Sequence, residues 1–197
     1  IRLVAATDMS VMIFGENGTG KEHIAHHLHD KSKRAGKPFV AVDCGSLTKE
    51  LAPSAFFGHV KGAFTGADST KKGYFYEAEG GTLFLDEVGN LALETQQMLL
   101  RAIQERRYRP IGDKSDRSFN VRIIAATNED LEAAVSEKRF RQDLFYRLHD
   151  FGITVPPLRD CQEDILPLAE FFREIANKEL ECNVSGFSSE ARKALLT

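Results

Sequence analysis

A glycine-rich run between an apolar strand and a helix constrains the fold of this chain more than any other feature. The run reads Gly15-Glu16-Asn17-Gly18-Thr19-Gly20-Lys21. Its glycines let the backbone curl so that successive N–H groups point at an anion, and the following helix adds its positive dipole end. Lys21 adds a full charge for the outer phosphates. The sequence therefore predicts a phosphate-binding loop and a nucleoside triphosphate ligand.

One position departs from the usual phosphate-loop pattern. After Lys21 the pattern has Ser or Thr, and this chain has Glu22 instead. A glycine-rich turn with an unrelated lysine is the alternative interpretation. However, residues 11–14 read as a buried strand before the run, and Ile24 and Leu28 follow it at helical spacing. This order of strand, loop and helix favours the phosphate-binding interpretation.

Composition restricts the partners and the compartment. The formal net charge is −3, so the chain has no general attraction for nucleic acid, and contact with DNA has to be local or come from another domain. Three cysteines lie far apart without C-x-x-C spacing, which favours a reduced, cytoplasmic protein. The apolar stretches are only strand-length, so we expect no membrane span. Because the chain begins at Ile1 shortly before its first strand, we expect a piece of a longer protein.

Apolar β-rich runs alternate with helical patterns along most of the chain. This alternation predicts a doubly wound α/β fold, and the continuous hydrophobicity of the runs predicts a parallel sheet covered on both faces. The predicted strands are residues 11–14, 39–42, 82–85, 121–126 and 151–155. The predicted helices are residues 20–33, 49–56, 93–106, 131–136 and 141–148. Only helical patterns follow, so we place an α/β core in residues 1–160 and a small helical subdomain in 161–197.

Two acidic residues end the third predicted strand. The segment reads Gly80-Gly81-Thr82-Leu83-Phe84-Leu85-Asp86-Glu87, so both carboxylates are expected at the C-terminal edge of the sheet, where open α/β sheets bind ligands. Asp86 is the candidate ligand for Mg²⁺, and Glu87 is the candidate base that orients and polarises the attacking water. Because Glu22 supplies no hydroxyl, the metal has to depend more on Asp86, phosphate oxygens and water. A strand end capped by solvated acids is the alternative.

Two polar residues close the fourth predicted strand, which ends in Ala125-Ala126-Thr127-Asn128. If the third and fourth strands are neighbours, Thr127 and Asn128 lie beside the acidic pair and place a neutral hydrogen-bonding group near the γ-phosphate. A simple strand-to-turn transition explains the same residues equally well. We expect ATP as the nucleotide, because Asn177-Lys178-Glu179-Leu180 lacks the aspartate that reads guanine in N-K-x-D.

A glycine-flanked loop lies between the second and third predicted strands. It reads Gly62-Ala63-Phe64-Thr65-Gly66-Ala67, and no period in its surroundings suggests a strand or a helix. Exposed aromatic residues on loops indicate binding, so Phe64 at the tip is a candidate partner contact. Burial of Phe64 in the core is an equally good interpretation from composition alone.

These segments together resemble one family. The sequence GAFTGA at 62–67 is similar to the signature loop of the AAA+ ATPase domain of sigma-54-dependent transcription activators, also called bacterial enhancer-binding proteins. The other family motifs also match, namely GENGTGKE at 15–22, GGTLFLDEVG at 80–89, AATN at 125–128, FRQDLFYRL at 140–148 and PPLR at 156–159. The resemblance covers essentially the whole chain, and the family carries Glu where Glu22 stands. It implies a P-loop NTPase sandwich of three layers with a five-stranded parallel sheet, followed by the start of a helical lid.

The resemblance also implies roles for residues of the predicted site. The glycine-rich run, with Lys21, binds the phosphates of ATP. Asp86 binds Mg²⁺, and Glu87 activates water. Thr127 and Asn128 match the sensor residues of the family.

Contacts with other molecules are implied in the same way. Arg141 and Arg147 match arginine fingers that reach into the site of a neighbouring subunit, so catalysis needs a ring, usually a hexamer. Spacing alone makes these two arginines a solvated helix face. Phe64 and Thr65 would contact sigma-54 when ATP raises their loop, and a second loop near residues 112–118 would move with it. The implied function is ATP-driven remodelling of the sigma-54 RNA polymerase holoenzyme, with DNA bound by a domain outside this chain.

Three positions depart from the family pattern. Asp43 stands where the family usually has an Asn that switches the partner of the catalytic Glu, and a carboxylate there repels Glu87 if both are charged. Val60 replaces a usual Glu, and Cys161 replaces a usual Arg. The chain also ends before the family's W-P-G-N-V-R-E-L segment, which carries the lid's sensor arginine. We therefore expect weak nucleotide binding and poor hydrolysis from this fragment alone.

Other interpretations compete with this one. A nucleotide-dependent assembly module with negligible hydrolysis would carry the same motifs, whereas a DNA motor or clamp loader would have no reason for the loop at 62–67. His23 and His27 have metal-ligand spacing, but no third ligand is in view. The arginines at 101–109 are a candidate DNA contact, and a solvated helix end or a subunit interface is the simpler explanation.

Overall fold

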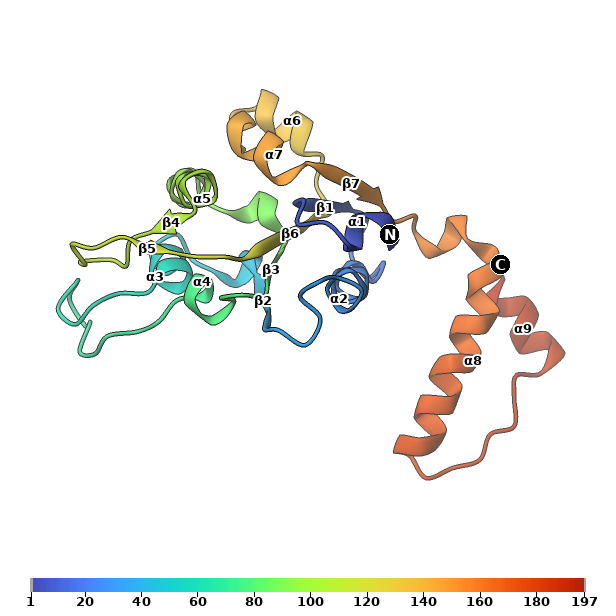
Figure 1. The fold of residues 1–197 in the computed structure, drawn as a ribbon. Helices are drawn as coiled ribbons and strands as arrows, with labels where there is room; N and C mark the ends of the chain where they lie inside the picture. Colours follow the sequence, from blue (N-terminus) through green and yellow to red (C-terminus); the bar gives the residue numbers. More distant parts are fainter. Residues whose placement is uncertain (1, 197) are drawn as a thin grey trace. The chain divides into compact units, whose positions relative to one another are not determined.

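One parallel sheet organises the first part of the chain. The computed structural model describes residues 2–196, and within them five strands pair in the order β2-β3-β6-β1-β7 (Figure 1). Every neighbouring pair of this sheet is parallel. The strands are β1 (Val11–Phe14), β2 (Phe39–Asp43), β3 (Thr82–Asp86), β6 (Arg122–Thr127) and β7 (Phe151–Thr154). The predicted doubly wound α/β fold with a five-stranded parallel sheet is therefore confirmed.

Helices cover both faces of the sheet because strand side chains alternate between two apolar clusters. Val11 and Ile13 belong to the smaller cluster, whereas Met12 between them belongs to the larger one. The smaller cluster is covered by α1 (Arg2–Ala5) and α2 (Lys21–Asp30). The larger cluster is covered by α3 (Ala52–Phe57), α4 (Tyr74–Glu77), α5 (Leu93–Glu105), α6 (Leu131–Ser136) and α7 (Gln142–Leu148). Figure 1 shows α2 below the strands and α5 and α7 above them, which gives the three layers.

Short elements account for most differences from the sequence expectations. The helix α3 begins at Ala52, later than expected, because Pro53 lacks an N–H and is accommodated in the first turn. The helix α5 ends at Glu105, because Arg106 has a left-handed backbone conformation with φ 54°. An antiparallel hairpin follows, which the sequence patterns did not predict. It consists of β4 (Arg107–Tyr108) and β5 (Arg117–Ser118). Part of the basic stretch is therefore a strand rather than a helix end.

A buried arginine fastens the N-terminal segment to the sheet. Arg122, the first residue of β6, is only 1% exposed. Its guanidinium donates hydrogen bonds to the carbonyl oxygens of Val4 and Ala5, both at 2.9 Å, and to that of Met9 at 3.2 Å. Carbonyls at the end of a short helix have no partner within the helix. Arg122 supplies those partners and holds α1 against the sheet.

The chain divides into two compact units between Val155 and Pro156. This boundary precedes the expected one at residue 160, because the short helix η3 (Leu158–Asp160) leads directly into α8 (Gln162–Glu179). In the second unit, Glu170 of α8 and Arg192 of α9 (Ser189–Leu195) form an ion pair at 3.2 Å. Its regular elements within the described residues are all helical, as the sequence patterns indicate. None of the helices in residues 2–196 has the length and hydropathy that crossing a bilayer requires.

Candidate active site

The carboxyl ends of four neighbouring strands meet at one edge of the sheet. Asp43 ends β2, Asp86 ends β3, Thr127 ends β6 and Gly15 follows β1. Asp43 and Asp86 are register partners, and the N–H of Gly15 donates to the carbonyl of Thr127 at 3.2 Å. The third and fourth predicted strands are neighbours, since β3 pairs with β6, so the condition stated for Thr127 and Asn128 is met. The glycine-rich run, the acidic pair and Thr127 therefore share this edge.

The glycine-rich run has the backbone that an anion-binding loop needs. Gly18 and Gly20 have φ 81° and 82°, in the left-handed region that favours glycine. No atom lies within 4 Å of the position of an added Cβ at either residue, so conformation rather than crowding requires glycine there. Gly20 is the N-cap of α2 and has no side chain to cap the helix. The first-turn N–H groups therefore remain available to a phosphate, which makes the loop fit for one.

Lys21 is folded back into this loop. Its Nζ donates to the carbonyl oxygens of Gly15 at 3.0 Å and Glu16 at 2.9 Å. Thr19 Oγ1 donates to the same Glu16 carbonyl at 2.8 Å. The side chain of Lys21 is buried. The amino group of Lys21 is therefore held against the main chain of the glycine-rich run.

The acidic pair is held by its own local contacts. Oδ1 of Asp86 accepts from the N–H of Glu87 at 3.0 Å. Glu87 has φ 50°, a conformation that residues other than glycine seldom adopt and that recurs at functional sites. It precedes the 3-10 helix η2 (Val88–Asn90), and its Oε2 accepts from Nδ2 of Asn90 at 2.9 Å. Sequence reasoning did not identify this contact.

The donor set at this edge suits Mg²⁺ only in part. A carboxylate such as that of Asp86 is a ligand that Mg²⁺ prefers. Among residues 2–196, however, no three His, Cys, Asp or Glu side chains gather where they could hold a metal ion. His23 and His27 therefore have no third ligand among these residues with which to form a metal site. A magnesium ion at Asp86 would depend on phosphate oxygens and water for its remaining ligands, as expected from the absence of a hydroxyl at Glu22.

Thr127 and Asn128 differ in exposure. Thr127 is buried, and its Oγ1 accepts from the N–H of Glu129 at 3.0 Å, whereas Asn128 is exposed. Gly89, two residues after Glu87, packs against this strand end, since an added Cβ there would lie 2.6 Å from Glu129 Oε2 and 3.6 Å from Thr127 Oγ1. A cavity of about 440 Å³ extends from the phosphate loop to these residues, and Phe14, Gly15, Glu16, Thr127, Asn128 and His149 are among those that line it.

Asp43 lies close to the acidic pair. Its Oδ1 accepts from the N–H of Gly45 at 2.8 Å and caps the short helix η1 (Cys44–Ser46). A Cβ at Gly45 would lie 3.2 Å from that Oδ1 and 2.7 Å from Glu87 Oε2, so the two carboxylates flank the same glycine. Burial raises the pKa of the Cys44 thiol, and the charges of the neighbouring carboxylates add to this effect. Cys44 is therefore a buried thiol and not a nucleophile.

Arg141 and Arg147 lie at opposite ends of α7. The guanidinium of Arg141 contacts Asp143 through two hydrogen bonds, at 3.0 and 2.8 Å, which lowers the pKa of that carboxyl. The N–H of Arg141 donates to Gln96 Oε1 at 2.8 Å, which fixes the start of the helix against α5. Arg147 is exposed. Both side chains are accessible enough to contact a second subunit.

The loop at 62–67 is a set of tight turns. Gly62 and Gly66 have φ 81° and 94°, and the N–H of Gly62 donates to the carbonyl of Ala67 at 2.8 Å. Phe64 is 46% exposed, and its ring stands edge-on to His59 at 5.0 Å. Phe64 is thus not buried in the core, which was one of the two interpretations of the sequence. Thr65 is exposed.

A second segment supports the base of this loop. His59 forms isolated β-bridges with both Lys71 and Ile111, and the N–H of Val60 donates to the carbonyl of Ile111 at 3.0 Å. An added Cβ at Gly112 would lie 2.8 Å from Cβ of Ala63. The loop at 62–67 and the segment at 112–118, whose last two residues form β5, are therefore in contact at their bases.

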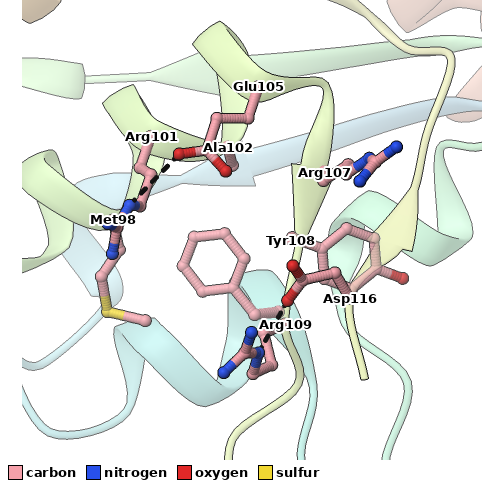
Figure 2. A pocket seen from close by; sticks show the side chains of 9 residues that line it. Met98, Arg101, Ala102, Glu105, Arg107, Tyr108, Arg109 and Asp116 are labelled. Atoms are coloured by element: carbon pink, nitrogen blue, oxygen red, sulfur yellow. Dashed lines mark hydrogen bonds and ion pairs between the residues drawn. The ribbon is translucent and has the colours of Figure 1, made fainter. Parts of the chain in front are cut away.

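Another cavity, of about 490 Å³, lies beside the basic stretch (Figure 2). Its lining includes Arg101, Arg107 and Arg109 around apolar side chains. Figure 2 shows Arg101 paired with Glu105 and Arg109 paired with Asp116. The N–O distances of these ion pairs are 3.3 and 2.7 Å. Because two of these three arginines face carboxylates, the cavity does not concentrate positive charge for a nucleic-acid backbone.

Comparisons with known proteins identify the family of this chain. A family model described as the sigma-54 interaction domain matches residues 1–154. The transcriptional regulatory protein GlrR of Escherichia coli is 47% identical over 196 residues, which cover 100% of this chain and 44% of GlrR. The alginate biosynthesis transcriptional regulatory protein AlgB of Pseudomonas putida is 50% identical over 195 residues, which cover 99% of this chain and 44% of AlgB. The chain spans less than half the length of these curated relatives.

Solved structures of a related protein share the fold. A crystal structure of NtrX from Brucella abortus in complex with ADP matches with a TM-score of 0.92 and 34% identity, over 99% of this chain and 42% of that one. NtrX in complex with ATP matches with a TM-score of 0.81 and 38% identity, over 89% of this chain and 40% of that one. From the family match and these identities, the chain belongs to the sigma-54 interaction domains of sigma-54-dependent transcriptional regulators.

Proposed function

We propose that this domain hydrolyses ATP and uses the energy to remodel the sigma-54 RNA polymerase holoenzyme, so that the promoter opens. One observation carries the proposal: the phosphate loop, the acidic pair and Thr127 occupy neighbouring strand ends at one edge of the sheet. The nucleotide complexes of NtrX support the choice of ligand. The loop at 62–67, with Phe64 partly exposed at its tip, supports sigma-54 as the partner.

Each residue of the edge has a proposed task in hydrolysis. The N–H groups of the phosphate loop and Lys21 bind the phosphates. Asp86 holds Mg²⁺, which neutralises charge on the phosphate oxygens when it is bound. Glu87 takes up a proton or orients water for attack, and Thr127 with Asn128 detects the terminal phosphate.

Catalysis in this proposal needs a ring of subunits, usually six. Arg141 and Arg147 would act in the site of the neighbouring subunit, where an arginine that meets charge developing in the transition state is worth about 10³–10⁵ in rate. Residues 161–197 would form the start of a helical lid. A domain outside this chain would bind DNA. These partners require the protein to act in the cytoplasm.

A mixing experiment tests the ring directly. Full-length Glu87→Gln has a disabled site but intact arginines, and full-length Arg147→Ala has an intact site but lacks one arginine. Neither is expected to hydrolyse ATP alone, whereas their mixture regains turnover at mixed interfaces. Turnover per wild-type subunit should also rise steeply with protein concentration. Steady turnover by dilute monomers contradicts the proposal, and ring formation with ATP but without phosphate release supports an assembly module instead.

A further inference from the structure

Glu87 has a hydrogen-bond partner three residues along the chain. Nδ2 of Asn90 donates to its Oε2 at 2.9 Å. The backbone builds this contact, because Glu87 has φ 50° and the N–H of Asn90 donates to the Glu87 carbonyl at 3.0 Å. Residues i and i+3 of a 3-10 turn lie above one another, which brings both side chains to the same side.

Gly45 leaves the space that this carboxylate occupies. A Cβ at Gly45 would lie 2.7 Å from Oε2 of Glu87 and 3.1 Å from Nδ2 of Asn90. Gly45 is not among the glycines with positive φ, so its backbone does not require glycine. Glycine at position 45 instead leaves space for the carboxylate of Glu87, because it has no side chain.

The position of Gly45 shows where the Glu87 carboxylate points. Gly45 follows β2, and β2 flanks β3 on the side opposite to β6 and β1. The phosphate loop follows β1. The carboxylate therefore lies toward the end of β2 and is turned away from the phosphate loop.

Asp43 is not the donor in this arrangement. Its Oδ1 already accepts from the N–H of Gly45, and an ionised carboxylate has no proton to donate to another carboxylate. Position 43 is the switch that the family resemblance implies. In this chain, the donor that faces Glu87 is Asn90.

We propose that Asn90 is a positioning residue that holds Glu87 in a resting position, and that Glu87 leaves Asn90 before it activates water. This inference rests on the catalytic role proposed for Glu87. Asn90 is exposed and Glu87 is half-buried. A single hydrogen bond between such groups is weak enough to break in every turnover.

Two variants of Asn90 test whether this residue holds Glu87 in the resting position. Steady-state ATP hydrolysis is measured in the full-length protein with Mg²⁺. Asn90→Ala removes the amide, and Asn90→Asp keeps the size but replaces the donor with a charge that repels Glu87. Both are expected to raise kcat about three- to tenfold, the range that one such hydrogen bond allows, while KM for ATP stays within about twofold. An unchanged or lower kcat in a folded Asn90→Asp variant overturns the inference.

Gly45→Ala disturbs the contact between Glu87 and Asn90 by steric crowding. This variant tests the inference if the Asn90 variants do not fold. The new methyl group displaces the mobile end of Glu87, so kcat should rise as it does in Asn90→Ala. In the double variant Gly45→Ala/Asn90→Ala, kcat should rise no further than in the more active single variant, because both changes act on one contact. If instead the two single gains in kcat multiply in the double variant, the two changes act independently, and the inference is overturned. Ser46→Ala is the matched control, since it loses a 2.8 Å hydrogen bond in the same turn.

Glu87→Gln separates this inference from the proposed function. If Glu87→Gln hydrolyses ATP at the wild-type rate, the proposed catalytic role of Glu87 fails, and the inference fails with it. If Glu87→Gln is inactive while both Asn90 variants keep the wild-type kcat, only the positioning role of Asn90 fails.

Discussion

Nζ of Lys21 lies 3.0 Å from the carbonyl oxygen of Gly15, so the cation that closes the phosphate loop is bound to the residue that opens it. This contact places the charge before a phosphate arrives. Lys21→Ala is expected to weaken ATP binding about tenfold or more, because hydrogen bonds to charged groups contribute about 1.5–3 kcal/mol. Titration calorimetry with ATP measures this loss. Lys33→Ala, which removes an exposed lysine, is the control, and wild-type affinity in Lys21→Ala would contradict the phosphate role.

Glu87→Gln should separate binding from hydrolysis. The amide keeps the shape of the side chain but cannot take a proton from water. We expect kcat to fall about 10²–10⁴-fold, the usual contribution of a general base, with ATP affinity close to wild type. Phosphate release and nucleotide titration measure the two quantities. Glu105→Gln, at an exposed position paired with Arg101, is the control.

Thr65→Ala should separate hydrolysis from partner binding. Thr65 is exposed, so loss of its hydroxyl should leave the fold and the ATPase rate within about twofold of wild type. Binding of sigma-54 in the presence of an ATP transition-state analogue is expected to be lost in a pull-down or anisotropy assay. Ser69→Ala, outside the loop but also exposed, should bind normally. Intact sigma-54 binding by Thr65→Ala would remove the loop assignment.

Arg122→Met should destabilise the fold. The change leaves the carbonyls of Val4, Ala5 and Met9 without their buried donor, and we expect a loss of about 2–4 kcal/mol in the free energy of unfolding. Urea denaturation measures the loss. Arg101→Met is the control, because its ion pair is exposed and such pairs contribute about 0–1 kcal/mol. Equal stability of the two variants would contradict the anchoring role of Arg122.

His29 should make the fold sensitive to mild acid. Its Nδ1 lies 2.9 Å from Oγ1 of buried Thr82, and burial lowers the pKa of His29, although Asp30 opposes this shift. The unfolded chain therefore takes up the proton first as the pH falls through about 6.5. Stability decreases below that pH until the folded protein is protonated as well.

Comparison of variants isolates this effect from that of the acidic groups. When the pH is lowered from 7.5 to below about 6.5, His29→Gln should lose less free energy of unfolding than the wild type, because it has no imidazole ring to protonate. His23→Gln, at an exposed position of the same helix, should follow the wild type. Equal pH dependence in His29→Gln and wild type would exclude His29 as the cause.

The sequence predicted the elements that repeat a pattern. β1 has its predicted bounds, and α5 and α8 are long enough to show a helical period. By contrast, β4 and β5 contain two residues each, which is too short for any alternation. Likewise, α1 is a single turn whose position depends on Arg122, far along the chain.

The positions of the candidate site residues were predictable where they end or directly follow a strand. The phosphate loop and the pair Asp86-Glu87 are of this kind. Asn90 and Gly45 were missed, because their contacts depend on the positive φ of Glu87 and on the pairing of β2 with β3. The available signal was an amide three residues after the acid, which gains meaning only once the turn between them is known.

The bridges at His59 have a mechanical consequence. His59 pairs with Lys71 on one side and with Ile111 on the other. The loop at 62–67 and the segment at 112–118 therefore project from one shared base. Main-chain hydrogen bonds join them there, and these do not depend on which side chains the tips carry. We therefore expect a force that lifts one projection to reach the other through these main-chain hydrogen bonds.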